Sequence, residues 1–214
     1  MSISHRQLAS TALLCASLLL PVAALSAQQA APVRSNTEKL MLSLALGGAS
    51  IDSDELEAER ESGGGFSLQV GWGFTRLFTL LVDASAAVLG DDDDEFVLLH
   101  GDLLGRFHFT NPQRAWVPFI EGGLTGRVAA QDDIAIIDAN GNPQQVDLEI
   151  SGGGFTFGGG LQYHVRPAVA LGASLRWTVG EFSTVKFNNV SIEGFEIDAT
   201  SARLNLGVTW RPLR

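Results

Sequence analysis

The feature that most limits the fold of this chain is a period-two alternation of apolar and polar side chains, repeated eight times from Leu40 onward. In one example, Phe66 and Leu68 alternate with Ser67 and Gln69. Such alternation predicts β-strands, because successive side chains of a strand point to opposite faces of the sheet. The apolar positions of the eight segments cover residues 40–46, 66–74, 78–88, 97–109, 116–128, 155–165, 169–179 and 202–210.

The length of these segments favours a membrane-spanning barrel. A tilted strand of about ten residues crosses the hydrocarbon core of a bilayer, and no segment after residue 27 is long and apolar enough for a membrane helix. An open sheet in lipid would leave unpaired backbone groups at its edges, so the strands must close on themselves. The sequence therefore predicts an all-β fold, an eight-stranded antiparallel up-and-down transmembrane β-barrel over residues 38–214.

The connections between the predicted strands differ at the two ends. Those at 75–77, 110–114 and 166–168 are short and carry Arg76, Arg114 and Arg166. The others are mostly longer, and they hold or border 20 of the 24 acidic residues. Short periplasmic turns and extended external loops are typical of bacterial outer-membrane barrels, which predicts an acidic external end and both termini in the periplasm. The formal net charge of −10 excludes a basic surface for nucleic acid.

The first 27 residues resemble a secretory signal peptide. Arg6 precedes an apolar run from Leu8 to Leu20, which Pro21 and small residues up to Ala27 follow. We expect cleavage near Ala27, because the run is shorter than the roughly 20 residues of a membrane helix. Residues 28–37 are then a periplasmic N-terminal segment. The single cysteine, Cys15, lies in the part expected to be removed, so a disulfide is not expected.

Bulky aromatic residues lie near the ends of the apolar faces. Such residues gather at the two interfaces of a bilayer, where they form girdles around a barrel. All four tryptophans occupy strand ends, which a soluble β-sandwich with core aromatics would not require. The predicted girdle near the short turns comprises Trp72, Phe74, Phe78, Phe107, Phe109, Trp116, Tyr163 and Trp210, and the one near the long loops comprises Phe66, Phe155, Phe157 and Trp177.

Two dipeptides predict hairpin turns at the external end. Asn140 and Gly141 are typical of a two-residue turn. Counting back from them places Trp116 opposite Val165 and, farther out, residue 127 opposite residue 154.

Asn188 and Asn189 suggest a similar turn, which places Leu175 opposite Ala202. Both hairpins are then long enough to project beyond the membrane, where we expect them to contact surface partners.

The segment from Val117 to Gly123 and the final outward aromatic residue, Trp210, add to the eightfold pattern. Together they resemble the small outer-membrane barrel family that includes the OmpA transmembrane domain, OmpX and OmpW, over residues 38–210. The resemblance implies insertion into outer-membrane lipid by the barrel-assembly machinery. It also implies an alternative function, an OmpW-like passage for small apolar molecules, for which Leu81, Leu89 and Leu98 are the candidate lining. Residues 211–214 depart from the family, which often ends on the aromatic.

If the apolar face meets lipid, the polar face fills the barrel. Its charged residues fall at similar heights, and buried charges must be paired. The sequence therefore predicts an ion-paired, closed lumen without a constitutive pore. The predicted network comprises Asp83, Asp102, Glu121, Arg106, Arg127, Arg176 and Arg203.

These features favour a structural or surface-interaction role in the cell envelope. We expect no enzymatic activity, since His100, His108 and His164 lie on the lumen face and no Ser-His-acid group occurs at the external rim. We expect neither a cofactor nor a dedicated metal site, because the acidic run of residues 91–95 lacks the glycine and spacing of a calcium loop. Weak association of divalent cations with the acidic loops is compatible with the sequence. The glycine clusters at 63–65, 152–154 and 158–160 are expected to relieve crowding in a narrow barrel.

Overall fold

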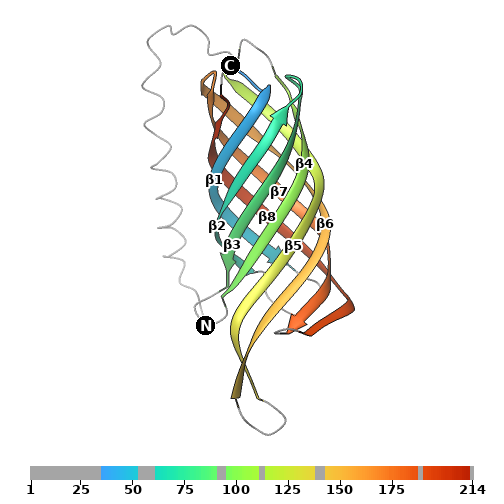
Figure 1. Cartoon of the computed structure of the whole chain (residues 1–214). Coiled ribbons are helices and arrows are strands. Elements are labelled where there is room, and N and C mark those ends of the chain that lie inside the picture. The colour runs from blue at the N-terminus through green and yellow to red at the C-terminus, as the bar shows by residue number, and fades with distance from the viewer. Residues whose placement is uncertain are drawn as a thin grey trace, which may run out of the picture. The chain divides into compact units, whose positions relative to one another are not determined.

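The computed structural model describes residues 35–52, 61–90, 95–110, 114–137, 143–187 and 190–212 (Figure 1). These residues form a closed antiparallel barrel in which each strand pairs with its neighbours in sequence and β8 pairs with β1. The predicted fold is confirmed. The strands are β1 (Lys39–Asp52), β2 (Glu61–Gly73), β3 (Phe78–Leu89), β4 (Phe96–His108), β5 (Trp116–Ile137), β6 (Pro143–Arg166), β7 (Val169–Phe187) and β8 (Val190–Trp210).

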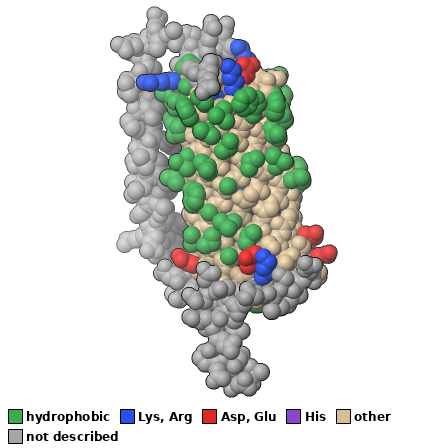
Figure 2. All heavy atoms as spheres, in the orientation of Figure 1, with side chains coloured by type: hydrophobic (Ala, Val, Ile, Leu, Met, Phe, Trp, Pro, Cys, Tyr) green, Lys and Arg blue, Asp and Glu red, His purple; other side chains and the backbone are tan. Residues whose placement is uncertain are grey.

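The two faces of the wall follow the alternation of the sequence. In β1, Leu44 and Leu46 are exposed on the outside, whereas Met41 and Ser43 are buried inside. All twelve predicted girdle aromatics lie on the outside, with exposed fractions between 38% and 61%. Figure 2 shows apolar side chains over the wall and charged ones at its two ends. Within the described residues, no helix is long and apolar enough to cross a membrane.

The two halves of the barrel differ in height. Strands β1–β4 contain 12–14 residues, whereas β5–β8 contain 19–24. The additional residues of β5 and β6 extend the wall at the end opposite the short turns (Figure 1). The predicted leader and most of the N-terminal segment lie outside the described residues, so they remain predictions.

The pairing of β5 with β6 differs from the predicted register. Trp116 lies opposite Tyr163 rather than Val165, and Arg127 lies opposite Gly152 rather than Gly154. The register shifts between Gln131 and Ile134, where β5 has one residue more than its partner. The final pair, Ile137 and Pro143, encloses five residues instead of two. The error was two residues, so every side chain kept its predicted face. The predicted turn residues Asn140 and Gly141 lie outside the described residues.

The pairing of β7 with β8 was predicted correctly only at its outer end. Phe187 lies opposite Val190, which fits a two-residue connection, although Asn188 and Asn189 lie outside the described residues. Farther down, Leu175 lies opposite Leu204 rather than Ala202. The register shifts between Phe182 and Thr184, where β8 contains extra residues that include Gly194. Gly194 has a φ of 84°, a left-handed conformation that side-chain-bearing residues rarely adopt.

Candidate functional site in the barrel lumen

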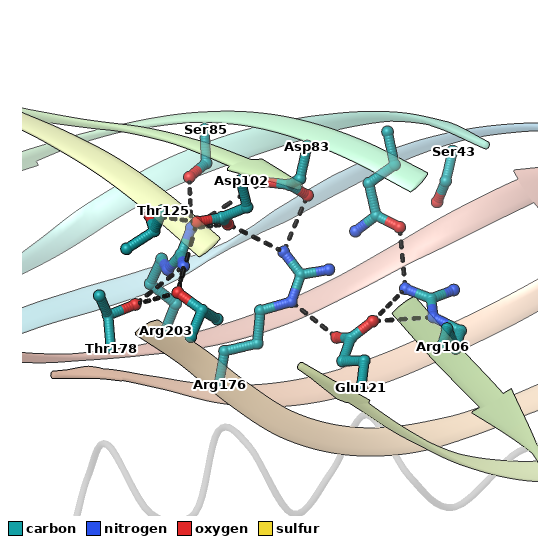
Figure 3. Close-up of polar contacts among 12 residues, drawn as sticks. Ser43, Asp83, Ser85, Asp102, Arg106, Glu121, Thr125, Arg176, Thr178 and Arg203 are labelled. Atoms are coloured by element: carbon teal, nitrogen blue, oxygen red, sulfur yellow. Dashed lines mark hydrogen bonds and ion pairs between the residues drawn. The ribbon is translucent and has the colours of Figure 1, made fainter. Parts of the chain in front are cut away.

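The centre of the lumen is the guanidinium of Arg176, from β7. Its Nε donates to Glu121 Oε1 at 2.7 Å, and its Nη1 lies 2.8 Å from Asp83 Oδ2 and 3.8 Å from Asp102 Oδ2. All four side chains are fully buried. One arginine of β7 therefore contacts carboxylates from β3, β4 and β5 on the opposite wall (Figure 3).

Arg203 of β8 makes the second set of contacts. Its Nη1 lies 2.8 Å from Asp102 Oδ2 and donates to Ser85 Oγ at 2.9 Å. Its Nη2 donates to Thr178 Oγ1 at 3.1 Å and to Thr156 Oγ1 at 3.3 Å. Hydroxyl groups from three strands thus accept hydrogen bonds from both terminal nitrogens of Arg203, whereas its Nε has no partner among the described residues.

Arg106 of β4 extends the cluster toward the short turns. Its Nη2 lies 2.7 Å from Glu121 Oε2, and it also donates to Gln69 Oε1 at 3.1 Å. The guanidinium lies over the ring of Phe119, 4.2 Å from the ring centre. Glu121 is therefore shared between Arg106 and Arg176.

The strand register explains why these charges meet across the lumen. Asp83 lies directly opposite Asp102 in the β3–β4 ladder, and Arg176 lies directly opposite Arg203 in the β7–β8 ladder. Like charges in opposing positions of a ladder are destabilising. Two acids on one wall and two arginines on another relieve this repulsion by contacting each other across the bore.

Arg127 lies outside this network. Its Nη1 donates to the carbonyl of Ala199 at 3.0 Å, and its guanidinium lies 4.7 Å from the ring centre of Phe182. It faces His100 in the β4–β5 ladder, nearer the external end than the carboxylates. The structure thus brings together six of the seven predicted residues, and Arg127 contacts none of the three acids among the described residues.

Arg211 is a lumen residue that the sequence interpretation missed. It is buried, it donates from Nη1 to the carbonyl of Thr37 at 2.7 Å, and its backbone N donates to the carbonyl of Ala168, also at 2.7 Å. Burial and the charge of Arg106 lower the pKa of Arg211 to about 9, so it remains a cation at neutral pH. The alternation could have revealed it, because every second residue of β8 from Arg203 points inward and Arg211 continues that series.

The space beside the network is small. A cavity of about 20 Å³ is lined by Gln69, Arg106, Gln162 and Asn205, among others. A second, of about 10 Å³, borders His100. A cavity of the larger size has room for about one water molecule.

Apart from Arg127, the external end of the lumen is lined largely by apolar side chains. Leu89 and Leu98 are buried against Ala49 and Ala87, and a second cluster consists of Phe182, Ile197 and Ala199. We call these seven residues the apolar collar.

Leu81, predicted to accompany Leu89 and Leu98, instead packs with Met41 and Leu104 in a separate cluster. Met41 lies beside Arg106, which places this cluster on the other side of the ion pairs. The prediction of a common lining was therefore wrong for Leu81, because the charged side chains separate the two apolar regions.

Comparison with known proteins agrees with this architecture. Residues 17–211 match the family model of the outer membrane protein beta-barrel domain. The chain belongs to this family. It is therefore an outer-membrane β-barrel protein, as the resemblance to OmpA-like barrels predicted. A search of curated proteins finds no match.

Solved structures share the fold at low sequence identity. Neisserial surface protein A has a TM-score of 0.60 and 16% identity, over 81% of this chain and 97% of that one. The outer membrane protein OprG from Pseudomonas aeruginosa has a TM-score of 0.51 and 11% identity, over 83% of this chain and 98% of that one. At these identities the likeness concerns the fold alone.

Proposed function

We propose that this protein is a closed outer-membrane barrel that serves the cell envelope as a structural or surface-interaction protein rather than as a pore. The observation that carries the proposal is the contact of Arg176 with carboxylates from three strands of the opposite wall. An eight-stranded barrel is only wide enough for its own side chains. A cross-lumen ion-pair cluster therefore occupies the bore itself.

The energetics of burial favour a permanently filled lumen. Both side chains of the Arg176–Glu121 pair are fully buried, and each ion is also hydrogen-bonded. Separating such a pair leaves an uncompensated charge in a poorly solvated place, at a cost of about 3–5 kcal/mol. Opening a path for water would require several such separations at once, since Asp83 and Arg203 belong to the same cluster.

The surface role rests on the external extension of β5–β8. This extension carries acidic side chains, among them Glu149, Glu181 and Asp198. Such a surface favours partners with basic groups and loosely associated divalent cations. Removing the outer part of the β5–β6 hairpin from the full-length protein should abolish retention of a surface partner while the barrel remains folded.

Planar-bilayer recordings of the purified protein test the closed lumen. We expect no steady conductance for the natural sequence. Glu121→Gln should produce intermittent conductance, because Arg106 and Arg176 lose their shared counter-charge. Glu149→Gln alters an exposed ion pair with Lys186 and should behave like the parent protein. A large steady conductance of the natural sequence would overturn the proposal.

The apolar collar favours a second candidate function, passage of small apolar molecules from the external mouth into the membrane. Leu89 and Leu98 are completely buried at this end, so such a molecule would have to displace them in order to pass. Uptake of an apolar dye by protein-containing vesicles distinguishes the two functions. A closed barrel gives the rate of empty vesicles.

We propose no catalytic role. His100, His108 and His164 are buried in the lumen, away from lipid and from the external rim. Unchanged mass of the lipid A from expressing cells is the expected result, and a changed mass would revive a lipid-modifying activity.

A further inference from the structure

Basic side chains are distributed evenly around the short-turn end of the barrel. Arg76 lies in the β2–β3 turn, Arg114 in the β4–β5 connection and Arg166 at the β6–β7 turn. Lys39, the first residue of β1, lies beside the seam between β8 and β1. We call these four residues the basic ring. One cation stands at every second strand, so the ring surrounds the circumference instead of forming a pocket.

The basic ring faces solvent. Arg76 has 60% of its side chain exposed, and the other three members are also exposed. The carboxylate of Glu38 lies 3.8 Å from the Arg76 guanidinium, and the two side chains are 44% and 60% exposed, so water screens this pair. Arg114 and Arg166 make no ion pair with any described residue. The guanidinium groups of Arg114 and Arg166 are thus available to an external anion, and that of Arg76 and the ammonium of Lys39 lie exposed at the same end.

The basic ring directly adjoins the lipid-facing aromatic girdle. Arg76 lies between Phe74 and Phe78, whose rings stack at 6.3 Å on the outside of the wall. Arg114 precedes Trp116, whose ring packs 4.5 Å from that of Tyr163.

Arg166 follows Tyr163 by three residues. Figure 2 shows blue side chains at this end, next to the apolar band. Because aromatic girdles mark the interface of a bilayer, the ring lies at the depth of the lipid headgroups.

We propose that the basic ring binds the phosphate groups of anionic phospholipids in the periplasmic leaflet, and so selects the lipids that surround the barrel. The charge is complementary, and the circular arrangement matches lipids, which approach from every side. A single soluble partner would contact only part of the circumference. This proposal depends on the placement of the barrel in the membrane and not on whether the lumen is closed.

Lipid selectivity of the folded full-length protein tests the proposal. The protein is placed in bilayers of phosphatidylcholine, and its preference for spin-labelled phosphatidylglycerol over spin-labelled phosphatidylcholine is measured. A basic residue near an anionic surface contributes about fivefold to binding. The natural sequence should prefer phosphatidylglycerol severalfold, and 1 M salt should remove most of this preference, because the screening length falls to about 3 Å.

Two matched variants separate charge from folding. K39Q/R76Q/R114Q/R166Q should show equal affinity for both lipids, whereas K39R/R76K/R114K/R166K should keep the preference. Lys186→Gln, at the opposite end, should also keep it. If the fourfold neutral variant does not fold, each single neutral variant should lose part of the preference on its own.

An unchanged preference in the folded neutral variant would overturn the proposal. Peptidoglycan is the competing anionic partner on this side. If the neutral variant lost binding to isolated peptidoglycan sacculi while its lipid preference stayed that of the parent, the ring would serve the sacculus and the lipid proposal would be wrong.

Discussion

Two ion pairs of this protein have the same length but very different surroundings. Arg176 and Glu121 lie 2.7 Å apart with both side chains fully buried. Lys186 and Glu149 also lie 2.7 Å apart, but each side chain is more than 40% exposed. Water solvates the separated charges of the second pair but not those of the first. Equal distances therefore imply unequal contributions to stability.

Arg176→Met is expected to lower the free energy of unfolding by about 3–5 kcal/mol, because Asp83 loses its closer cation and Glu121 loses one of its two while both acids remain buried. Lys186→Met should lower it by less than about 1 kcal/mol. Urea titration of both variants in lipid vesicles measures the difference. Equal losses in the two variants would contradict this account of the lumen.

Arg211 ties three chain segments together behind the last strand. Arg211→Ala removes the hydrogen bond to the carbonyl of Thr37 and the contact with Met41, and we expect the free energy of unfolding to fall by about 1–3 kcal/mol. Arg114→Ala, which removes an exposed arginine at the same end, is the control and should change little. The temperature at which the folded band disappears on a denaturing gel measures both, and a larger loss in the Arg114 variant would refute the role of Arg211.

The alternation of inward and outward positions along the strands explains which residues of the site could be predicted from the sequence. Asp83, Asp102 and Glu121 occupy inward positions in a clear alternation, so their burial followed from the sequence. Arg211 was missed because the strand was taken to end at its final aromatic residue. Arg127 was placed in the network because a period of two specifies the face of a residue but not the particular partner it meets across a bore.

At the level of the strands, the alternation of apolar and polar residues predicted the face of each side chain and the order of the strands, but not the register between strands. The turn residues are local signals, whereas register along a long hairpin also depends on bulges. Near Phe187 the predicted pairing is correct, and below Gly194 it is displaced by two residues. The extra residues of a bulge do not interrupt the apolar pattern, so the alternation did not predict the position of the bulge.

The glycines of β6 allow neighbouring elements to approach. A Cβ atom on Gly160 would lie 2.6 Å from the ring of Phe119 and 2.2 Å from the carbonyl oxygen of Ala173. Gly160→Ala is therefore expected to cost about 1–3 kcal/mol of unfolding free energy. Gly126→Ala, on the adjacent strand with open space around its Cβ position, should be close to neutral. Urea unfolding of both variants tests this, and an equal cost would show that the inward clash is not the cause.

For the whole molecule, the separation of charge was readable before the structure was known. Among the described residues, Glu149, Glu181 and Asp198 lie at one end, and Arg76, Arg114 and Arg166 lie at the other. Chain order alone predicts this separation, because consecutive connections of an up-and-down barrel alternate between its ends. The unequal height of the wall was harder to predict from the sequence. The residues that extend β5–β8 are more polar, so the alternation did not distinguish strand from loop there.

That unequal height makes the external end of the barrel asymmetric about the barrel axis. Among the described residues, β5–β8 extend farther than β1–β4 at the end opposite the short turns, so they form a crest on one side of the barrel. Contact from above is thus directional, although a barrel is round in cross-section. Copies of the protein that rotate freely about the membrane normal would point this crest in all directions in the membrane plane. A partner bound to the crests of two copies would fix the orientation of one copy relative to the other.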